Sequence, residues 1–110
     1  MATRKHIVTI GLVQMQCSAR PQANLKHGLA LVETAAKRGA HIVCLPELFR
    51  SLYFCQTEDH RQFALAEPIP GPTTKTLGNA ARKHRVVLIG SIFERRGAGV
   101  YHNTEVQNTE

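Results

Sequence analysis

The sequence lacks the features of a secreted or membrane-spanning protein. It has only three cysteines, and no two of them are closely spaced, so no disulfide framework is expected. Its N-terminal residues include no apolar segment of the kind that secretory signals carry. The longest apolar stretches are as short as strands and are interrupted by glycine, glutamine or proline, which argues against a membrane-spanning segment. We therefore expect a soluble protein of the reducing cytoplasm.

Clustered metal ligands and long basic runs are also missing. The six histidines occur singly and no pair has the spacing of a zinc site, so no metal site is expected. The chain is basic, with 14 lysines and arginines against 8 aspartates and glutamates. These cations are spread along the sequence, and several lie where a helix is expected to end, where they interact favourably with the helix dipole. Nucleic-acid binding is therefore the less favoured interpretation of the charge.

The apolar content is sufficient for one folded domain. Hydrophobic residues make up 43% of the chain and charged residues 20%, which is typical of a globular protein. A length of 110 residues allows one domain at most, and it is below the size at which α/β enzymes usually assemble a complete site.

The order of the apolar segments predicts strands that alternate with helices. The expected elements are strands at 7–15, 41–45, 86–93 and 100–106, helices at 21–38 and from about 72 to 84, and a short helix at 58–66. The apolar faces of the two long helices are expected to consist of Leu25, Leu29, Val32 and Ala36, and of Leu77, Ala80, Ala81 and His84. The first strand, helix and second strand suit a parallel crossover, and the last two strands suit an antiparallel pair across a tight basic turn at 95–99.

One carboxylate stands out because it directly follows a buried strand. Glu47 lies in the sequence Ile-Val-Cys-Leu-Pro-Glu-Leu-Phe at 42–49, and ligands of open α/β sheets collect beyond the carboxyl ends of such strands. Pro46 donates no ladder hydrogen bond and so favours an exit from the sheet. A charged residue after a strand is most often a solvated loop residue or a helix N-cap, so position alone leaves the role of Glu47 open.

An ordered set of short segments resembles the N-terminal part of the nitrilase superfamily of carbon-nitrogen hydrolases. These segments are residues 13–15, 24–25, 45–49, 53–56, 70–73, 90–94 and 101–104. The ordered set is far more specific than any one of its members, and it covers nearly the whole chain. The Tyr-Phe-Cys-Gln sequence at 53–56 most resembles the N-carbamoylputrescine amidase branch, which would place the protein in polyamine biosynthesis.

The resemblance implies a fold, a reaction and a substrate class. The fold would be α/β, with residues 1–110 forming the N-terminal half of an αββα sandwich in the order β-α-β-α-β-β, a truncated domain. The reaction would use a Glu-Lys-Cys triad without a cofactor, in which Glu47 is the general base, a cysteine thiolate attacks and a lysine stabilises the oxyanion. The substrate would be a small amide or carbamoyl compound. Tyr53 and Phe54 are candidates for its pocket, although aromatic residues after a strand more often serve packing.

The chain also departs from the family pattern. The lysine and cysteine of the family lie on later strands, and Lys75, Lys83 and the three cysteines match neither motif. Cys44 is expected to be an inert buried thiol, whereas Cys55 could line a pocket. Residues 105–110 are polar where the family continues with an apolar strand, as in a truncated or frameshifted reading frame.

The remaining expectations follow from this partial match. For Glu94, an ion pair with Arg95 or with a neighbouring helix is expected at least as much as a role in chemistry. The segment 101–103 is expected to be structural, and a contact with the active-site loop is the less favoured alternative. Half a sandwich leaves a sheet face uncovered, so we expect a homo-oligomer or aggregation. The favoured hypothesis is the N-terminal portion of an amidohydrolase, inactive by itself. The alternative is a non-catalytic or degenerate α/β module that binds a partner or an anionic surface.

Overall fold

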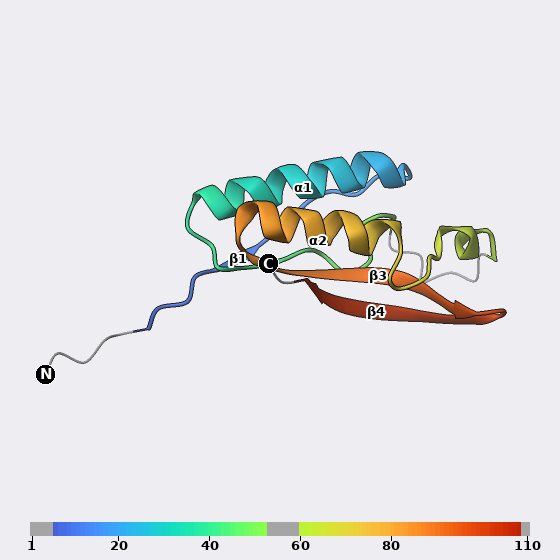
Figure 1. The fold of residues 1–110 in the computed structure, drawn as a ribbon. Coiled ribbons are helices and arrows are strands. Elements are labelled where there is room, and N and C mark those ends of the chain that lie inside the picture. Colours follow the sequence, from blue (N-terminus) through green and yellow to red (C-terminus); the bar gives the residue numbers. More distant parts are fainter. Residues whose placement is uncertain (1–5, 53–59, 109–110) are drawn as a thin grey trace, which may run out of the picture.

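A computed structural model describes residues 6–52 and 60–108 of the protein. Two long helices lie on the same face of a four-stranded sheet (Figure 1). The elements in chain order are β1 (Ile10–Leu12), α1 (Pro21–Lys37), β2 (Ile42–Cys44), the 3-10 helix η1 (His60–Leu65), α2 (Pro72–His84), β3 (Val87–Gly97) and β4 (Val100–Asn108). Both long helices begin with a proline, whose fixed φ suits the first helical turn.

The strand order of the sheet is β1-β2-β3-β4. β1 and β2 are parallel and β3 and β4 are antiparallel, which confirms the two expected pairings. β2 and β3 are also parallel. The first two strands are shorter than expected, because only three residues of each strand pair on the ladder. A further hydrogen bond, from Val13 N to Cys44 O (2.9 Å), continues the contact by one residue beyond β1. β3 is longer than expected: the predicted turn at 95–99 reduces to residues 98–99, where Gly99 has φ +71°.

The core lies between the helices and the sheet. α1 buries Asn24, Gly28 and Val32, and α2 buries Thr73, Leu77 and Ala81, so each helix turns one narrow stripe toward the strands. The other residues expected on the inner faces, Leu25, Leu29, Ala36 and Ala80, pack against this core while remaining partly exposed, and His84 is half-buried. Leu77 lies so close to β3 that a Cβ added to Gly90 would stand 2.6 Å from its Cδ1, so a larger residue there would displace this buried side chain.

Asn24 connects the start of α1 to the segment that follows β2. Its Oδ1 accepts a hydrogen bond from Ser18 N (2.8 Å), and its Nδ2 donates to Ser18 O (2.8 Å) and to Arg50 O (2.9 Å). The N-cap residue Arg20 makes no side-chain hydrogen bond to the helix end. A buried amide inside the first turn therefore determines how the chain enters α1 and where residue 50 lies.

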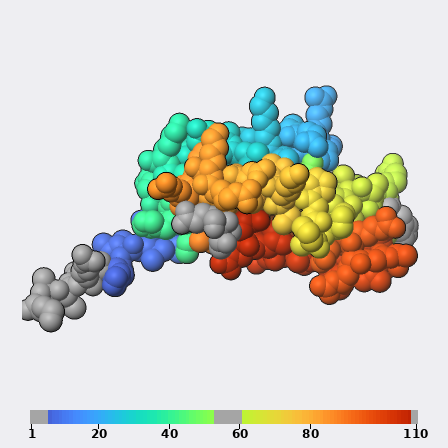
Figure 2. All heavy atoms as spheres, viewed as in Figure 1, coloured from blue at the N-terminus to red at the C-terminus, as the bar shows by residue number. Residues whose placement is uncertain are grey.

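The opposite face of the sheet carries exposed apolar side chains. A Cβ on Gly11 would approach Ala35 of α1 to 3.0 Å, so Gly11 faces the helices, and its neighbours Ile10 and Leu12 point away from them. Their exposed fractions are 58% and 77%. We call this side of the sheet the open face. The helices form a continuous layer on the other side, and residues 6–9 project beyond it (Figure 2).

Cys44 is less buried than the sequence suggested. Val43 takes the position that faces the helices and is fully buried, so side-chain alternation directs Cys44 to the open face, where it is partly exposed. The expectation of a buried thiol was wrong because the strand has one covered face rather than two.

None of the helices in the described ranges is both long enough and apolar enough to cross a membrane.

The role of Asn24 predicts a measurable loss of stability in Asn24→Ala. The substitution leaves Ser18 N–H and Arg50 C=O without their partners, and one unsatisfied buried group costs about 1–3 kcal/mol. The midpoint of urea unfolding should fall accordingly. Asn79→Ala is the matched control, because Asn79 is exposed on α2 and alanine favours the helix. Equal midpoints for the two variants would contradict the assignment.

The open face predicts self-association of the 110-residue chain. Ile10→Lys combined with Leu12→Lys should shift the sedimentation velocity distribution toward monomer without unfolding the protein, because both side chains are exposed. Ala23→Lys combined with Thr34→Lys adds the same charge to exposed positions of α1 and should leave association unchanged. A monodisperse, cooperatively melting wild-type monomer would refute this prediction.

Candidate active site

Glu47 begins a turn that leaves the sheet. The last ladder bond before it runs from Leu45 N to Ile89 O (2.9 Å), and Pro46 cannot continue the ladder. Residues 47–50 then form the turn, in which the Glu47 side chain is exposed and Leu48 and Phe49 are buried. The local sequence thus directs one carboxylate outward and two apolar side chains inward.

A chain of hydrogen bonds orients this carboxylate. Leu48 N donates to Ser91 Oγ (3.0 Å), Ser91 Oγ donates to Asn103 Oδ1 (2.9 Å), and Asn103 Nδ2 donates to Glu47 Oε1 (2.5 Å). Ser91 comes from β3 and Asn103 from β4. The Ser91 hydroxyl has only one hydrogen, so accepting from Leu48 leaves that hydrogen for Asn103 and determines which side of the amide faces Glu47. The turn and the hairpin therefore position Glu47 jointly.

The two oxygens of Glu47 differ in their surroundings. Oε1 accepts the bond from Asn103, whereas within residues 6–52 and 60–108 no hydrogen-bond donor or cation is bound to Oε2. Asn103 lies on the open face, because its neighbour Thr104 pairs with the buried Ile92 on the helix side. This arrangement can hold a carboxylate in place through one oxygen while the other oxygen receives a proton.

Leu48 has a backbone conformation that is uncommon for a side-chain-bearing residue. Its φ is +49°, in the left-handed region, which costs a non-glycine residue of order 1–3 kcal/mol. Its N–H is bonded to Ser91, its carbonyl oxygen accepts from Ser51 N (3.1 Å), and its side chain is buried. These contacts hold the turn in the conformation that separates the directions of Glu47 and Leu48.

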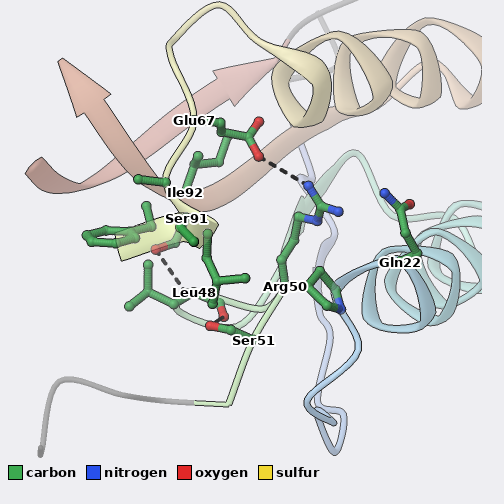
Figure 3. A pocket seen from close by; sticks show the side chains of 12 residues that line it. Gln22, Leu48, Arg50, Ser51, Glu67, Ser91 and Ile92 are labelled. Atoms are coloured by element: carbon green, nitrogen blue, oxygen red, sulfur yellow. Dashed lines mark hydrogen bonds and ion pairs between the residues drawn. The ribbon is translucent and has the colours of Figure 1, made fainter. Parts of the chain in front are cut away.

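A cavity lies behind the turn (Figure 3). Its volume is about 370 Å³, and its wall includes Leu48, Arg50, Ser51, Glu67 and Ser91. Glu47 is not among the residues that line it. Leu48 and Ser91 connect the cavity to Glu47, because each contacts the cavity and takes part in the hydrogen-bond chain.

The other expected site residues have different locations. Tyr53, Phe54 and Cys55 lie outside the described residues. Lys75 and Lys83 are exposed on α2, in the layer on the opposite side of the sheet from Asn103. Cys17 Sγ donates to Phe49 O (3.2 Å), and burial raises the pKa of the Cys17 thiol, which disfavours the thiolate that a nucleophile requires.

The remaining polar and aromatic predictions were partly correct. Glu94 does pair with an arginine, but with Arg96 (3.7 Å) rather than Arg95, and it also accepts a hydrogen bond from Thr104 (2.7 Å). Tyr101 stacks on Phe63 with ring centroids 4.5 Å apart, which is the expected packing role. Asn103, expected to be structural, contacts Glu47 directly, and Ser91 was not singled out.

Comparison with known proteins identifies the family. Residues 9–108 match the model of the carbon-nitrogen hydrolase family. The chain is 33% identical over 107 residues to an N-carbamoylputrescine amidase of Solanum lycopersicum and 39% identical over 95 residues to the omega-amidase NIT2 of Mus musculus. The crystal structure of a carbon-nitrogen hydrolase from Helicobacter pylori G27 superimposes with a TM-score of 0.78 at 32% identity.

The matches cover most of this chain but a smaller share of the relatives. The two amidases are matched over 96% and 86% of this chain, and over 36% and 33% of their own lengths. The crystal structure is matched over 91% of this chain and 35% of its own. The chain therefore spans about a third of the length of these relatives, and its mixed α/β fold corresponds to that part of a nitrilase-type fold. By sequence and by fold, the chain belongs to the carbon-nitrogen hydrolase family.

Proposed function

We propose that residues 1–110 are the N-terminal portion of a carbon-nitrogen hydrolase domain that acts on a small amide or carbamoyl substrate, with Glu47 as the general base. The observation that supports this most is the hydrogen-bond chain through Ser91 and Asn103, which holds one oxygen of Glu47, while the other oxygen binds no donor among the described residues. A general base must be oriented toward the proton it removes, and this carboxylate is oriented by two strands.

The chemistry follows from what a held carboxylate can do. Glu47 would take the proton of a cysteine thiol, and the thiolate would attack the amide or carbamoyl carbon. The leaving nitrogen would receive that proton, and Glu47 would next deprotonate the water that hydrolyses the thioester. A lysine would stabilise the oxyanion that forms in both steps. The cysteine and the lysine would come from parts of the protein outside these 110 residues.

An N-carbamoyl amine is the candidate substrate. The N-carbamoylputrescine amidase of Solanum lycopersicum aligns over 96% of this chain, and hydrolysis of such a substrate would release the free amine, ammonia and carbon dioxide. The match to an omega-amidase makes a simple amide the competing substrate. Hydrolysis of either substrate belongs to the same reaction class. In each case the proposed mechanism needs a base that transfers protons, and it needs no cofactor.

Turnover by the product of the natural gene tests this proposal. Glu47→Gln keeps the acceptor for Asn103 but cannot take a proton, so ammonia release from N-carbamoylputrescine should fall by about 10²–10⁴-fold. Glu33→Gln, on the exposed face of α1, is the control and should leave the rate unchanged. The isolated 110-residue chain should release no ammonia above a buffer blank.

Three outcomes would count against the proposal. Full activity of Glu47→Gln in the natural gene product would exclude Glu47 as the base. Turnover by the isolated chain, abolished by Glu47→Gln, would show that the cysteine and the lysine are not supplied from elsewhere. A natural gene product that turns over neither carbamoyl nor amide substrates would favour the non-catalytic, partner-binding alternative.

A further inference from the structure

A second polar cluster lies at the other end of the turn that carries Glu47. Arg50 Nη1 lies 3.1 Å from Glu67 Oε2 and donates to Thr73 Oγ1 (2.7 Å). Thr73 Oγ1 in turn donates to Glu67 Oε2 (2.7 Å), and Thr73 N donates to Glu67 Oε1 (2.8 Å). Thr73 is fully buried, and the Arg50 and Glu67 side chains are only 22% and 12% exposed. Figure 3 shows Arg50 directed at Glu67 across the cavity wall.

Glu67 is attached to the sheet by its backbone and to α2 by its side chain. Glu67 N donates to Phe93 O (3.0 Å) and Arg95 N donates to Glu67 O (2.8 Å), so Glu67 pairs with β3 beyond the point where β2 ends. Its carboxylate accepts the N–H of Thr73 in the first turn of α2, where a negative charge also interacts favourably with the helix dipole. Glu67 is therefore a fixed point to which Arg50 is bound.

Arg50 connects Glu67 to the end of the 47–50 turn. Its backbone carbonyl accepts the bond from Asn24 and its side chain binds Glu67 and Thr73, so α1, β3 and α2 all constrain residue 50. Leu48, two residues earlier, has the left-handed backbone. Such a conformation persists only where the surroundings impose it. Ser91 holds the start of the turn, and the Arg50 cluster holds its end.

The cluster is poorly explained as a device for stability alone. Buried ion pairs contribute little net stability relative to apolar residues of similar size, because desolvation offsets their attraction. In addition, Arg50 Nε is buried and has no hydrogen-bond partner among residues 6–52 and 60–108, which lowers stability further. What apolar residues would not supply is the direction of the bonds between Arg50, Glu67 and Thr73. Both oxygens of the Glu67 carboxylate accept hydrogen bonds within the cluster.

We propose that Arg50, Glu67 and Thr73 are positioning residues that hold the end of the 47–50 turn so that the Glu47 carboxylate meets Asn103. This inference rests on the proposed function for its importance to catalysis, but the geometry it describes can be tested without turnover. The cluster acts through the backbone of the turn, because none of its hydrogen bonds among the described residues goes to Glu47.

The side-chain amide of Asn103 provides the readout. Its ¹H-¹⁵N resonances in spectra of the full 110-residue chain report the hydrogen bond to Glu47, and Glu47→Ala gives their position when that bond is lost. We expect Glu67→Ala to move these resonances most of the way to the Glu47→Ala position. Glu67→Gln keeps an acceptor for Thr73 N–H and should restore them in large part.

Two controls separate positioning from stability. Val32→Ala shortens a fully buried side chain of α1 and should lower the unfolding midpoint without moving the Asn103 resonances. Glu33→Ala removes an exposed ion pair, in which the hydrogen bond to Lys37 lowers the pKa of Glu33, and should change neither. If Glu67→Ala fails to fold, Arg50→Lys keeps the charge, loses the planar guanidinium and should move the same resonances.

Unmoved Asn103 resonances in folded Glu67→Ala, or in Arg50→Lys where the alanine variant does not fold, would overturn the proposal and leave the cluster a purely structural one. That result would not touch the assignment of Glu47 as the base, which is decided by the turnover of Glu47→Gln. Conversely, an active Glu47→Gln would refute the proposed base while the movement of the Asn103 resonances still demonstrated the positioning.

Discussion

The direction of the Glu47 side chain depends on the hydroxyl of Ser91, which links the turn after β2 to β4. This hydroxyl accepts from the turn after β2 and donates to Asn103 on β4. This contact exists because the neighbouring strands end at different places: β2 ends at Cys44, whereas β3 continues to Gly97. Beyond the end of β2, the edge of β3 is not paired with that strand. The turn contacts Ser91 there, and further along Glu67 pairs with Glu94. The uneven lengths of two parallel strands thus create the place in which the site is built.

Hydrogen bonds at both ends of the 47–50 turn offset the strained backbone of Leu48. A left-handed Leu48 costs of order 1–3 kcal/mol, and a typical hydrogen bond contributes about 1 kcal/mol net, so the bonds from Ser91, Ser51 and Asn24 are of the size needed to offset it. The Leu48 side chain is also buried, which adds a hydrophobic contribution. A site held in this way can keep a charged group in a defined direction at the surface.

The sequence predicted those features that depend on local chemistry. Proline at the first helical position predicted the start of both long helices, and the basic residues before Gly39 predicted the end of α1. The strand followed by Pro46 indicated Glu47 as a candidate site residue. The lengths of β1 and β2 could not be predicted, because the length of a ladder depends on how far two strands remain paired, which is a tertiary contact. The exposure of Cys44 was missed for a related reason: the sequence does not show which face of the sheet is covered.

The partners of Glu47 were beyond local reasoning. Ser91 and Asn103 are common polar residues, and they meet only because the β3-β4 hairpin turns at Gly99 and shifts its register between Arg95 and Gly97. The cluster of Arg50, Glu67 and Thr73 likewise joins three segments that show no shared pattern in the sequence. Such contacts follow from tertiary structure, whereas the family resemblance implied a role for Glu47 without indicating its contacts with Ser91 and Asn103.

The central claim is that these residues supply the base of a hydrolase whose cysteine and lysine lie elsewhere in the same protein. The intact mass of the natural gene product, isolated from its own cells, tests this most directly. The account predicts a mass well above 12.2 kDa, consistent with relatives of which this chain covers about a third. A mass of 12.2 kDa would mean that the triad is never completed in one polypeptide, and it would contradict the account.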